Sequence, residues 1–169
     1  MRLVSLNTWM GVVREPLLDF FSAHKDVDIF CLQEIYKDAV GKREEHPTLK
    51  IELELFERIQ ERLEDTHSGV FKPAVEDYYG LAIFHKNNLK ILEEGEVSIY
   101  DNPTWEASIS QRGKHSRNLQ YIRLLHAGSP LLIANVHGLW TGEGKGDTPE
   151  RLEQSRRIQD FLMRKYELK

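Results

Sequence analysis

A run of apolar residues that ends at a carboxylate constrains the fold of this chain more than any other feature. Residues 28–34 read Asp-Ile-Phe-Cys-Leu-Gln-Glu, with a turn-forming aspartate before the apolar run and two polar residues at its end. Such a run predicts a strand that is buried on both faces. Open sheets place their chemistry at the carboxyl ends of their strands, and this strand ends in Glu34. Glu34 is therefore a candidate metal ligand, and the alternative is a residue that caps the strand in solvent.

The composition is typical of a globular domain. The chain has 169 residues, of which 40% are hydrophobic and 30% charged, enough for a core of its own. No linker, repeat or low-complexity tract divides it, so we expect a single domain over residues 1–169. The formal net charge of -4 argues against binding nucleic acid by general electrostatics, although it leaves room for a local basic patch.

The cysteine count and the lack of long apolar stretches bear on the cellular compartment. Cys31 is the only cysteine, so no disulfide can form within the chain, and we expect a buried structural thiol. The first residues lack the pattern of a signal peptide, and no stretch approaches the roughly 18 apolar residues of a membrane span. We therefore expect a cytoplasmic protein without a membrane span.

The flanking segments predict a mixed α/β arrangement around the central strand. Residues 2–7 form a short predicted strand that ends at Asn7, and residues 17–21 form an apolar helical stripe. If the two strands are parallel, Asn7 and Glu34 lie at the same end of the sheet. The remaining patterns predict a helix over 49–63, strands at 70–71, 81–84 and 89–93, a surface loop over 100–114, a hairpin of 117–125 with 131–137, and a C-terminal helix introduced by 147–150. His24, His46 and His67 lie in or beside charged segments and are interpreted as surface residues.

Three predicted strands end in an amide, a carboxylate and an imidazole, those of Asn7, Glu34 and His137. A Mg²⁺ held by a carboxylate and an amide polarises a phosphoryl oxygen, while an imidazole donates a proton or a hydrogen bond to the developing charge. Arg117 begins a strand that faces the same cleft, so it is a candidate phosphate clamp or else a surface residue of the hairpin edge. Glu76 and Asp77 are candidates to orient His137, with solvated loop acids as the alternative.

Five segments in a fixed order carry a family resemblance, namely residues 4–9, 29–34, 80–84, 134–139 and 151–159, the last of which contains Gln154. In these segments the chain resembles the endonuclease/exonuclease/phosphatase superfamily, which includes deoxyribonuclease I, abasic-site endonucleases, deadenylases, neutral sphingomyelinases and inositol-phosphate 5-phosphatases. The resemblance implies a deoxyribonuclease I-like four-layer α/β/β/α sandwich. It also implies a phosphodiesterase, nuclease or phosphatase that depends on Mg²⁺ or Mn²⁺.

The resemblance also implies a role for each matching residue. Glu34 would ligate the metal, and Asn7 would help to hold the metal-side phosphate. His137 would contact the scissile phosphate or act as general acid, and Asn135, in the same motif, would bind substrate. The substrate stays open among nucleic acids, nucleotides and lipid or sugar phosphates. Trp9, Trp105 and Trp140 fall in predicted loops, where stacking on bases and ordinary packing are both open.

The chain departs from the family pattern after its last helix. Members continue to a strand that ends in Gly-Asp-x-Asn and later to a Ser-Asp-His sequence, and this chain has neither. The resemblance therefore implies the first two-thirds of the fold, incomplete at the C-terminus. Two functions stay open: a hydrolase, or a catalytically incomplete module that binds a phosphate-bearing ligand or a partner protein. Because apolar inner surface would be left uncovered, we expect self-association or a complementing chain.

Overall fold

The computed structural model describes residues 1–42, 48–102, 114–141, 144 and 146–167. The elements in chain order are β1 (Leu3–Asn7), the short 3₁₀ helix η1 (Trp9–Gly11), α1 (Arg14–Ala23), β2 (Ile29–Tyr36), α2 (Leu55–Leu63), β3 (His67–Val75), β4 (Tyr79–Lys86), β5 (Ile91–Tyr100), β6 (Arg117–His126), β7 (Ser129–Val136) and α4 (Pro149–Glu167). His46 and Trp105, for which the sequence suggests roles, lie outside these described residues.

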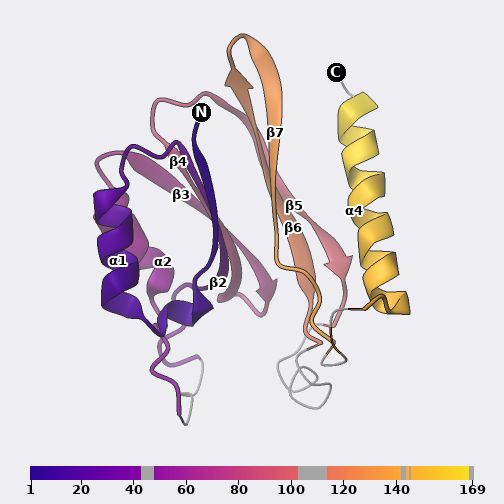
Figure 1. The fold of residues 1–169 in the computed structure, drawn as a ribbon, viewed down its shortest axis with the longest axis horizontal. Helices are drawn as coiled ribbons and strands as arrows, with labels where there is room; N and C mark the ends of the chain where they lie inside the picture. Colours follow the sequence, from indigo (N-terminus) through magenta and orange to yellow (C-terminus); the bar gives the residue numbers. More distant parts are fainter. Residues whose placement is uncertain (43–47, 103–113, 142–143, 145, 168–169) are drawn as a thin grey trace.

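The strands form two sheets that face each other. The first has the order β1-β2-β4-β3, with β1 parallel to β2 and the other pairs antiparallel. The second has the order β5-β6-β7 and is antiparallel throughout. Figure 1 shows α1 and α2 on the outer face of the first sheet and α4 on the outer face of the second. The predicted four-layer α/β/β/α sandwich is therefore confirmed.

Strand β2 is buried on both faces, as its apolar run predicts. Phe30 and Leu32 pack into the core beneath α1 and α2. Ile29 and Cys31 point the other way, into the layer between the two sheets, where Ile122 of β6 meets them. Burying an aliphatic or aromatic side chain of this size contributes about 1.5–3 kcal/mol, so both contact layers depend on this strand. Burial also raises the pKa of the Cys31 thiol to about 12, as suits an unreactive structural residue.

Some local expectations were wrong. The helix predicted over 49–63 begins only at Leu55, because Ile51 and Leu53 instead pack on the Tyr36 cluster at the end of the first sheet. His67 is buried rather than on the surface, and its Nε2 lies 2.8 Å from the carbonyl oxygen of Val27.

None of the helices in the described ranges combines the length and apolarity needed to cross a membrane. The cytoplasmic location stays a prediction.

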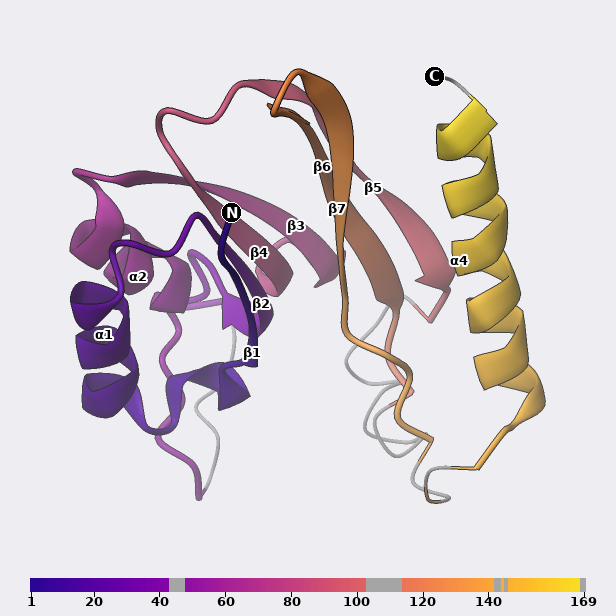
Figure 2. The same cartoon turned by 45° about the horizontal axis from the view of Figure 1, so that its top comes forward.

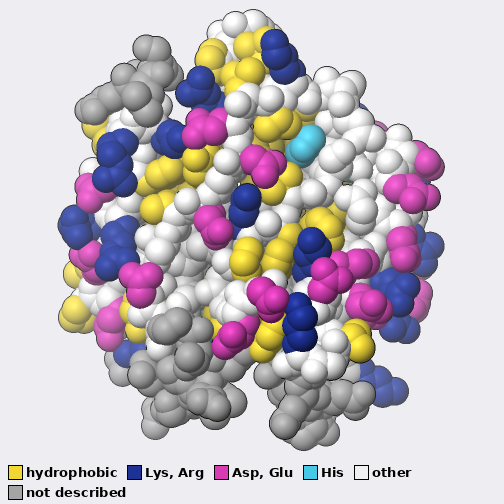
Figure 3. All heavy atoms as spheres, turned by 180° about the vertical axis from the view of Figure 1, so that it is seen from behind, with side chains coloured by type: hydrophobic (Ala, Val, Ile, Leu, Met, Phe, Trp, Pro, Cys, Tyr) yellow, Lys and Arg dark blue, Asp and Glu magenta, His cyan; other side chains and the backbone are white. Residues whose placement is uncertain are grey.

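The outer strands of the two sheets differ in their protection against further pairing. Lys72 and Pro73 interrupt the outer strand β3, and three glutamates lie on the outer strand β5. Figure 3, seen from behind, shows acidic and basic side chains mixed over that face. Strands β1 and β7 lie together on the opposite side in Figures 1 and 2, and neither contains a charged residue. Charges and prolines are the usual devices that prevent strands from pairing at an edge. Apart from Pro130 near the start of β7, strands β1 and β7 have neither, so their side is the open one.

We expect the protein to self-associate through this side, with β7 pairing to β7 of a second copy. Sedimentation velocity over a range of protein concentrations measures the effect. Ala134→Lys places a charge on an exposed position of β7 and should shift the protein to monomer. Ser68→Lys, on the protected outer strand β3, is the matched control and should change nothing. A monodisperse monomer at every concentration would contradict the expectation.

Candidate active site

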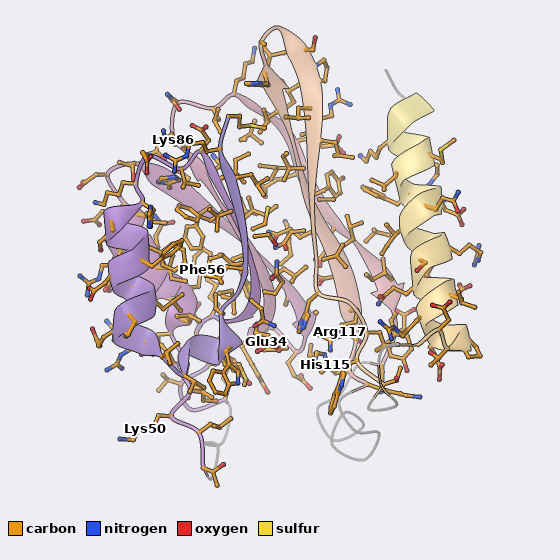
Figure 4. All side chains as sticks on the ribbon, in the orientation of Figure 1. Glu34, Lys50, Phe56, Lys86, His115 and Arg117 are labelled. Carbon is orange, nitrogen blue, oxygen red and sulfur yellow. The ribbon has the colours of Figure 1, made fainter. Side chains whose placement is uncertain are left out.

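The predicted site residues meet at one end of the sandwich. Asn7 ends β1, Glu34 lies near the end of β2, Arg117 begins β6 and His137 follows β7. Figure 4 shows Glu34 on the first sheet and Arg117 on the second at this same end. Because β1 and β2 are parallel, with Asn7 paired to Gln33, the amide and the carboxylate come from neighbouring strand ends, as expected from the sequence.

Glu34 occupies a β-bulge. In the pairing of β2 with β4, Gln33 faces Leu81 and Ile35 faces Gly80, so Glu34 is the extra residue. Its φ angle of 62° lies in the left-handed region, which costs a non-glycine residue about 1–3 kcal/mol. The bulge turns the carboxylate out of a strand whose other side chains are buried, and its side chain is 17% exposed.

Thr8 holds this strained backbone in place. Its hydroxyl donates to the carbonyl oxygens of Gln33 at 2.8 Å and Glu34 at 3.1 Å, and its backbone N–H donates to the Gln33 carbonyl at 3.0 Å. Thr8 itself is buried. The residue that follows Asn7 in the chain therefore fixes the bulge that presents Glu34.

Asn7 contacts the Glu34 carboxylate directly. The amide nitrogen Nδ2 donates to Glu34 Oε1 at 2.9 Å. The amide oxygen accepts the backbone N–H of Trp9 at 2.9 Å, which sets the orientation of the amide group. Asn7 thus orients the carboxylate as well as lying beside it.

Arg117 determines which nitrogen of His137 carries the proton. Arg117 Nη1 lies 2.9 Å from His137 Nδ1. A guanidinium can only donate hydrogen bonds, so Nδ1 must accept, and the proton of the neutral ring lies on Nε2. Nε2 is 3.7 Å from Glu34 Oε1, and His137 therefore directs an N–H group toward the Glu34 carboxylate.

The two basic groups respond differently to burial. Burial, and next the charge of Arg117, lower the pKa of His137 to about 4, so the ring is neutral at neutral pH. Burial also lowers the pKa of Arg117, but an arginine keeps its proton in proteins. Arg117 is only 5% exposed, and within the described part of the chain no carboxylate forms an ion pair with it. The site therefore contains a buried cation whose charge is not neutralised by a salt bridge.

Asn135 lies deeper, between the two sheets, and is 2% exposed. Its oxygen accepts from Gln33 Nε2 at 2.7 Å, and its nitrogen donates to the carbonyl oxygens of Leu32 at 2.9 Å and Ala82 at 3.2 Å. These bonds fix the end of β7, and hence His137, relative to β2 and Glu34. The substrate contact expected for Asn135 stays a prediction.

Glu76 and Asp77, the candidates to orient His137, do not do so, and both are exposed, as in the alternative of solvated loop acids. Asp77 pairs instead with Lys42 at 2.8 Å on the surface, and no hydrogen bond or ion pair of the described residues joins His137 to Glu76 or Asp77. The partner of His137 is Arg117. Arg117 is buried, so the alternative interpretation, a surface residue of the hairpin edge, was wrong.

His115 belongs to the same cluster and was not foreseen. It is 6% exposed, its ring meets Tyr79 edge to face at 5.4 Å, and Nδ1 lies 3.1 Å from the Ser116 carbonyl oxygen. Burial, and next the charge of Arg117, lower its pKa to about 3. The available signal was its position two residues before Arg117, because alternate residues of an extended segment lie on one side.

The donor set can be tested for its fit to a metal ion. No three His, Cys, Asp or Glu side chains of the described residues gather into a cage. Mg²⁺, however, is usually bound by one or two carboxylates and completes its shell with water and substrate phosphates. The contacts of Glu34 with Asn7 and His137 both involve Oε1, so Oε2 is the oxygen that would bind a cation. A single carboxylate beside an amide fits such an ion.

Comparisons with known proteins agree on the fold. No family model and no curated protein matches the sequence. Among solved structures, an endonuclease/exonuclease/phosphatase family protein from Leptotrichia buccalis matches 97% of this chain and 62% of its own, at 17% identity and a TM-score of 0.60. An endonuclease/exonuclease/phosphatase from Bacteroides vulgatus matches 94% of this chain and 58% of its own, at 14% identity and a TM-score of 0.63. A Bacteroides thetaiotaomicron mannosyl-6-phosphatase matches 95% of this chain and 58% of its own, at 18% identity and a TM-score of 0.61.

The chain thus spans about three fifths of the length of these structures. Structural matches at such low sequence identity establish the fold and leave the activity open. The family resemblance noted in the sequence is confirmed at that level, and the chain has the fold of the endonuclease/exonuclease/phosphatase proteins.

Proposed function

We propose that this chain is a metal-dependent phosphoester hydrolase that uses Mg²⁺ or Mn²⁺. One observation supports this proposal above all others. Asn7, Glu34 and His137 meet in one cluster with a buried Arg117 that has no anionic partner within salt-bridge distance among the described residues. A desolvated guanidinium beside a candidate metal ligand is suited to bind a phosphate group. The negative charge of the phosphate would then compensate the charges of both the guanidinium and the metal ion.

The residues of the chain would divide the work as follows. Glu34, oriented by Asn7, holds the cation, and the bound ion supplies positive charge to the phosphoryl oxygens. Arg117 binds the phosphate through N–H groups that do not contact His137. His137 is neutral and protonated on Nε2, so it donates a hydrogen bond to the phosphate or to the leaving oxygen. Preorganised donors of this kind typically contribute about 10²–10⁴-fold to the rate.

A second candidate is a module that binds phosphate without turnover. It is favoured by the lack, among the described residues, of any group of three His, Cys, Asp or Glu side chains that could hold a metal ion. In this reading the same four residues retain ligand binding but not catalysis.

The substrate class stays a proposal. Nucleic acids, nucleotides and lipid or sugar phosphates all carry the required group. Trp9 and Trp140 follow Asn7 and His137 closely in the chain and are 50% and 59% exposed, so both indoles are available to stack on a planar group. The net charge of -4 favours a small phosphoester or a lipid head group over long duplex DNA.

Hydrolysis and binding assays separate the two candidates. We would measure hydrolysis of bis(p-nitrophenyl) phosphate and p-nitrophenyl phosphate with Mg²⁺, Mn²⁺ or EDTA, and binding of inorganic phosphate by calorimetry. Hydrolysis that requires the metal supports the hydrolase. Phosphate binding that is lost in Arg117→Met, without any hydrolysis, supports the binding module. Neither hydrolysis nor binding would overturn both.

A further inference from the structure

Two buried polar atoms of the site have no hydrogen-bond partner in the described part of the chain. They are Nε of Arg117, a donor, and Oδ1 of Asn118, an acceptor. Both residues are buried and line the same small cavity, whose other walls are Ala74, Tyr79, Gly80, Leu81 and His137. A buried polar atom without a partner costs stability, so this coincidence of a donor and an acceptor needs a physical explanation.

The orientation of the Asn118 amide is fixed by its other end. Nδ2 donates to the carbonyl oxygens of Lys72 at 3.3 Å and Pro73 at 3.0 Å and to Glu96 Oε2 at 2.5 Å. Turning the amide over would place its oxygen against three acceptors. Oδ1 therefore has to stay where it is, as an acceptor beside the cavity.

The orientation of the Arg117 guanidinium is fixed in part by Nη1, which donates to His137 Nδ1. The group is planar, so that bond also restricts the direction of the Nε–H. The cavity measures about 10 Å³, close to the space that one water molecule requires. A buried water needs two to four polar partners, and the two atoms supply one donor and one acceptor.

We propose that a single buried water molecule binds in this cavity, accepting a hydrogen bond from Arg117 Nε and donating one to Asn118 Oδ1. Asn118 then acts as a positioning residue, since it holds Arg117 through the water. Arg117 is restrained at two points, by His137 and by the water, and its remaining N–H groups are aimed at the phosphate. This last step rests on the proposed function, whereas the water site itself does not.

The water site is tested by NMR on the full chain. In the ¹⁵N-labelled protein, the Nε–H of Arg117 should exchange slowly and give a cross-peak to a long-lived water. Asn118→Leu removes the acceptor and should abolish the cross-peak. A purely structural role for Asn118, through its Nδ2 bonds alone, predicts that the cross-peak persists in this variant.

Two further variants keep the test decisive. Gln120→Leu removes another amide bond between the sheets, from Gln120 Nε2 to the Val70 carbonyl oxygen, and should leave the cross-peak intact. Ala74→Val fills the cavity while leaving both Arg117 and Asn118 in the chain, and it should remove the cross-peak even if Asn118→Leu does not fold. No water cross-peak in the unaltered protein, or one that persists in both Asn118→Leu and Ala74→Val, would overturn the proposal.

Phosphate affinity tests the positioning role separately. Inorganic phosphate should bind at least about tenfold more weakly to Ala74→Val than to the unaltered protein, because Arg117 is less well oriented. Equal affinity would mean that the water is present without a positioning role. If the unaltered protein shows the water but binds no phosphate, the proposed function fails and the water site stands.

Discussion

Replacing Glu34 by glutamine is expected to lower metal-dependent hydrolysis by about 10²–10⁴-fold while the fold is kept. Glutamine has the same shape, and its Oε1 can still accept the hydrogen bond from Asn7 Nδ2 that the structure gives to Glu34. The substitution removes only the negative charge, which is the property that holds a divalent cation. Steady-state kcat/KM, measured over a range of Mg²⁺ concentrations, gives the loss and any increase in the metal requirement.

Glu94→Gln provides the matched control. Glu94 lies on β5, where its carboxylate contacts Lys72 at 3.5 Å on the surface. The same chemical change there should leave kcat/KM unaltered. If Glu34→Gln retained full activity with an unchanged metal requirement, Glu34 would not be the metal ligand and the proposed mechanism would be wrong.

Glycine at position 34 separates function from stability. Glu34 has a φ angle of 62°, a conformation that glycine adopts without strain. Glu34→Gly should therefore abolish hydrolysis yet raise the free energy of unfolding by up to about 1 kcal/mol, as measured by urea denaturation. A clear loss of stability would mean instead that the carboxylate contacts hold the bulge together.

The sequence predicted that Asn7, Glu34 and His137 lie close together because strand ends are local features. An apolar run that stops at Glu34 and a parallel strand that stops at Asn7 place both side chains at one edge of a sheet, whatever the rest of the fold does. The same argument applies to His137 after β7. The α/β/β/α order of the layers was inferred from the family resemblance. The periodicity of apolar residues alone does not predict it.

The interior contacts of the site were beyond sequence reasoning because they join the two sheets. Asn135 and Gln33 are 102 residues apart, and their hydrogen bond exists only once the sheets have packed. The contact of Arg117 with His137 is a different case, because both residues belong to the β6–β7 hairpin that the sequence predicted, in which Leu119 pairs with Val136. His67 was misassigned because its charged neighbours in the sequence say nothing about the Val27 carbonyl that its ring meets.

Acidification from about pH 6.5 to 5 is expected to destabilise the protein strongly through His115. Its pKa is about 3 in the folded protein, against about 6.5 in an unfolded chain. Between these values the unfolded chain binds a proton that the folded protein does not bind, so stability falls as the pH falls. The slope approaches about 1.4 kcal/mol per pH unit for this residue. His137, with a pKa of about 4, contributes with the same sign.

Urea denaturation at several pH values from about 7.5 to 5 measures this slope before most carboxylates begin to titrate. His115→Gln should reduce the slope of the free energy of unfolding against pH. Because the two proteins are compared by this slope, an overall loss of stability in the variant does not affect the result. Equal slopes with and without His115 would show that the folded protein can protonate this ring. The same low pKa explains how two histidines can lie beside a buried Arg117: neither adds positive charge at neutral pH, and the cation is left for an anionic ligand.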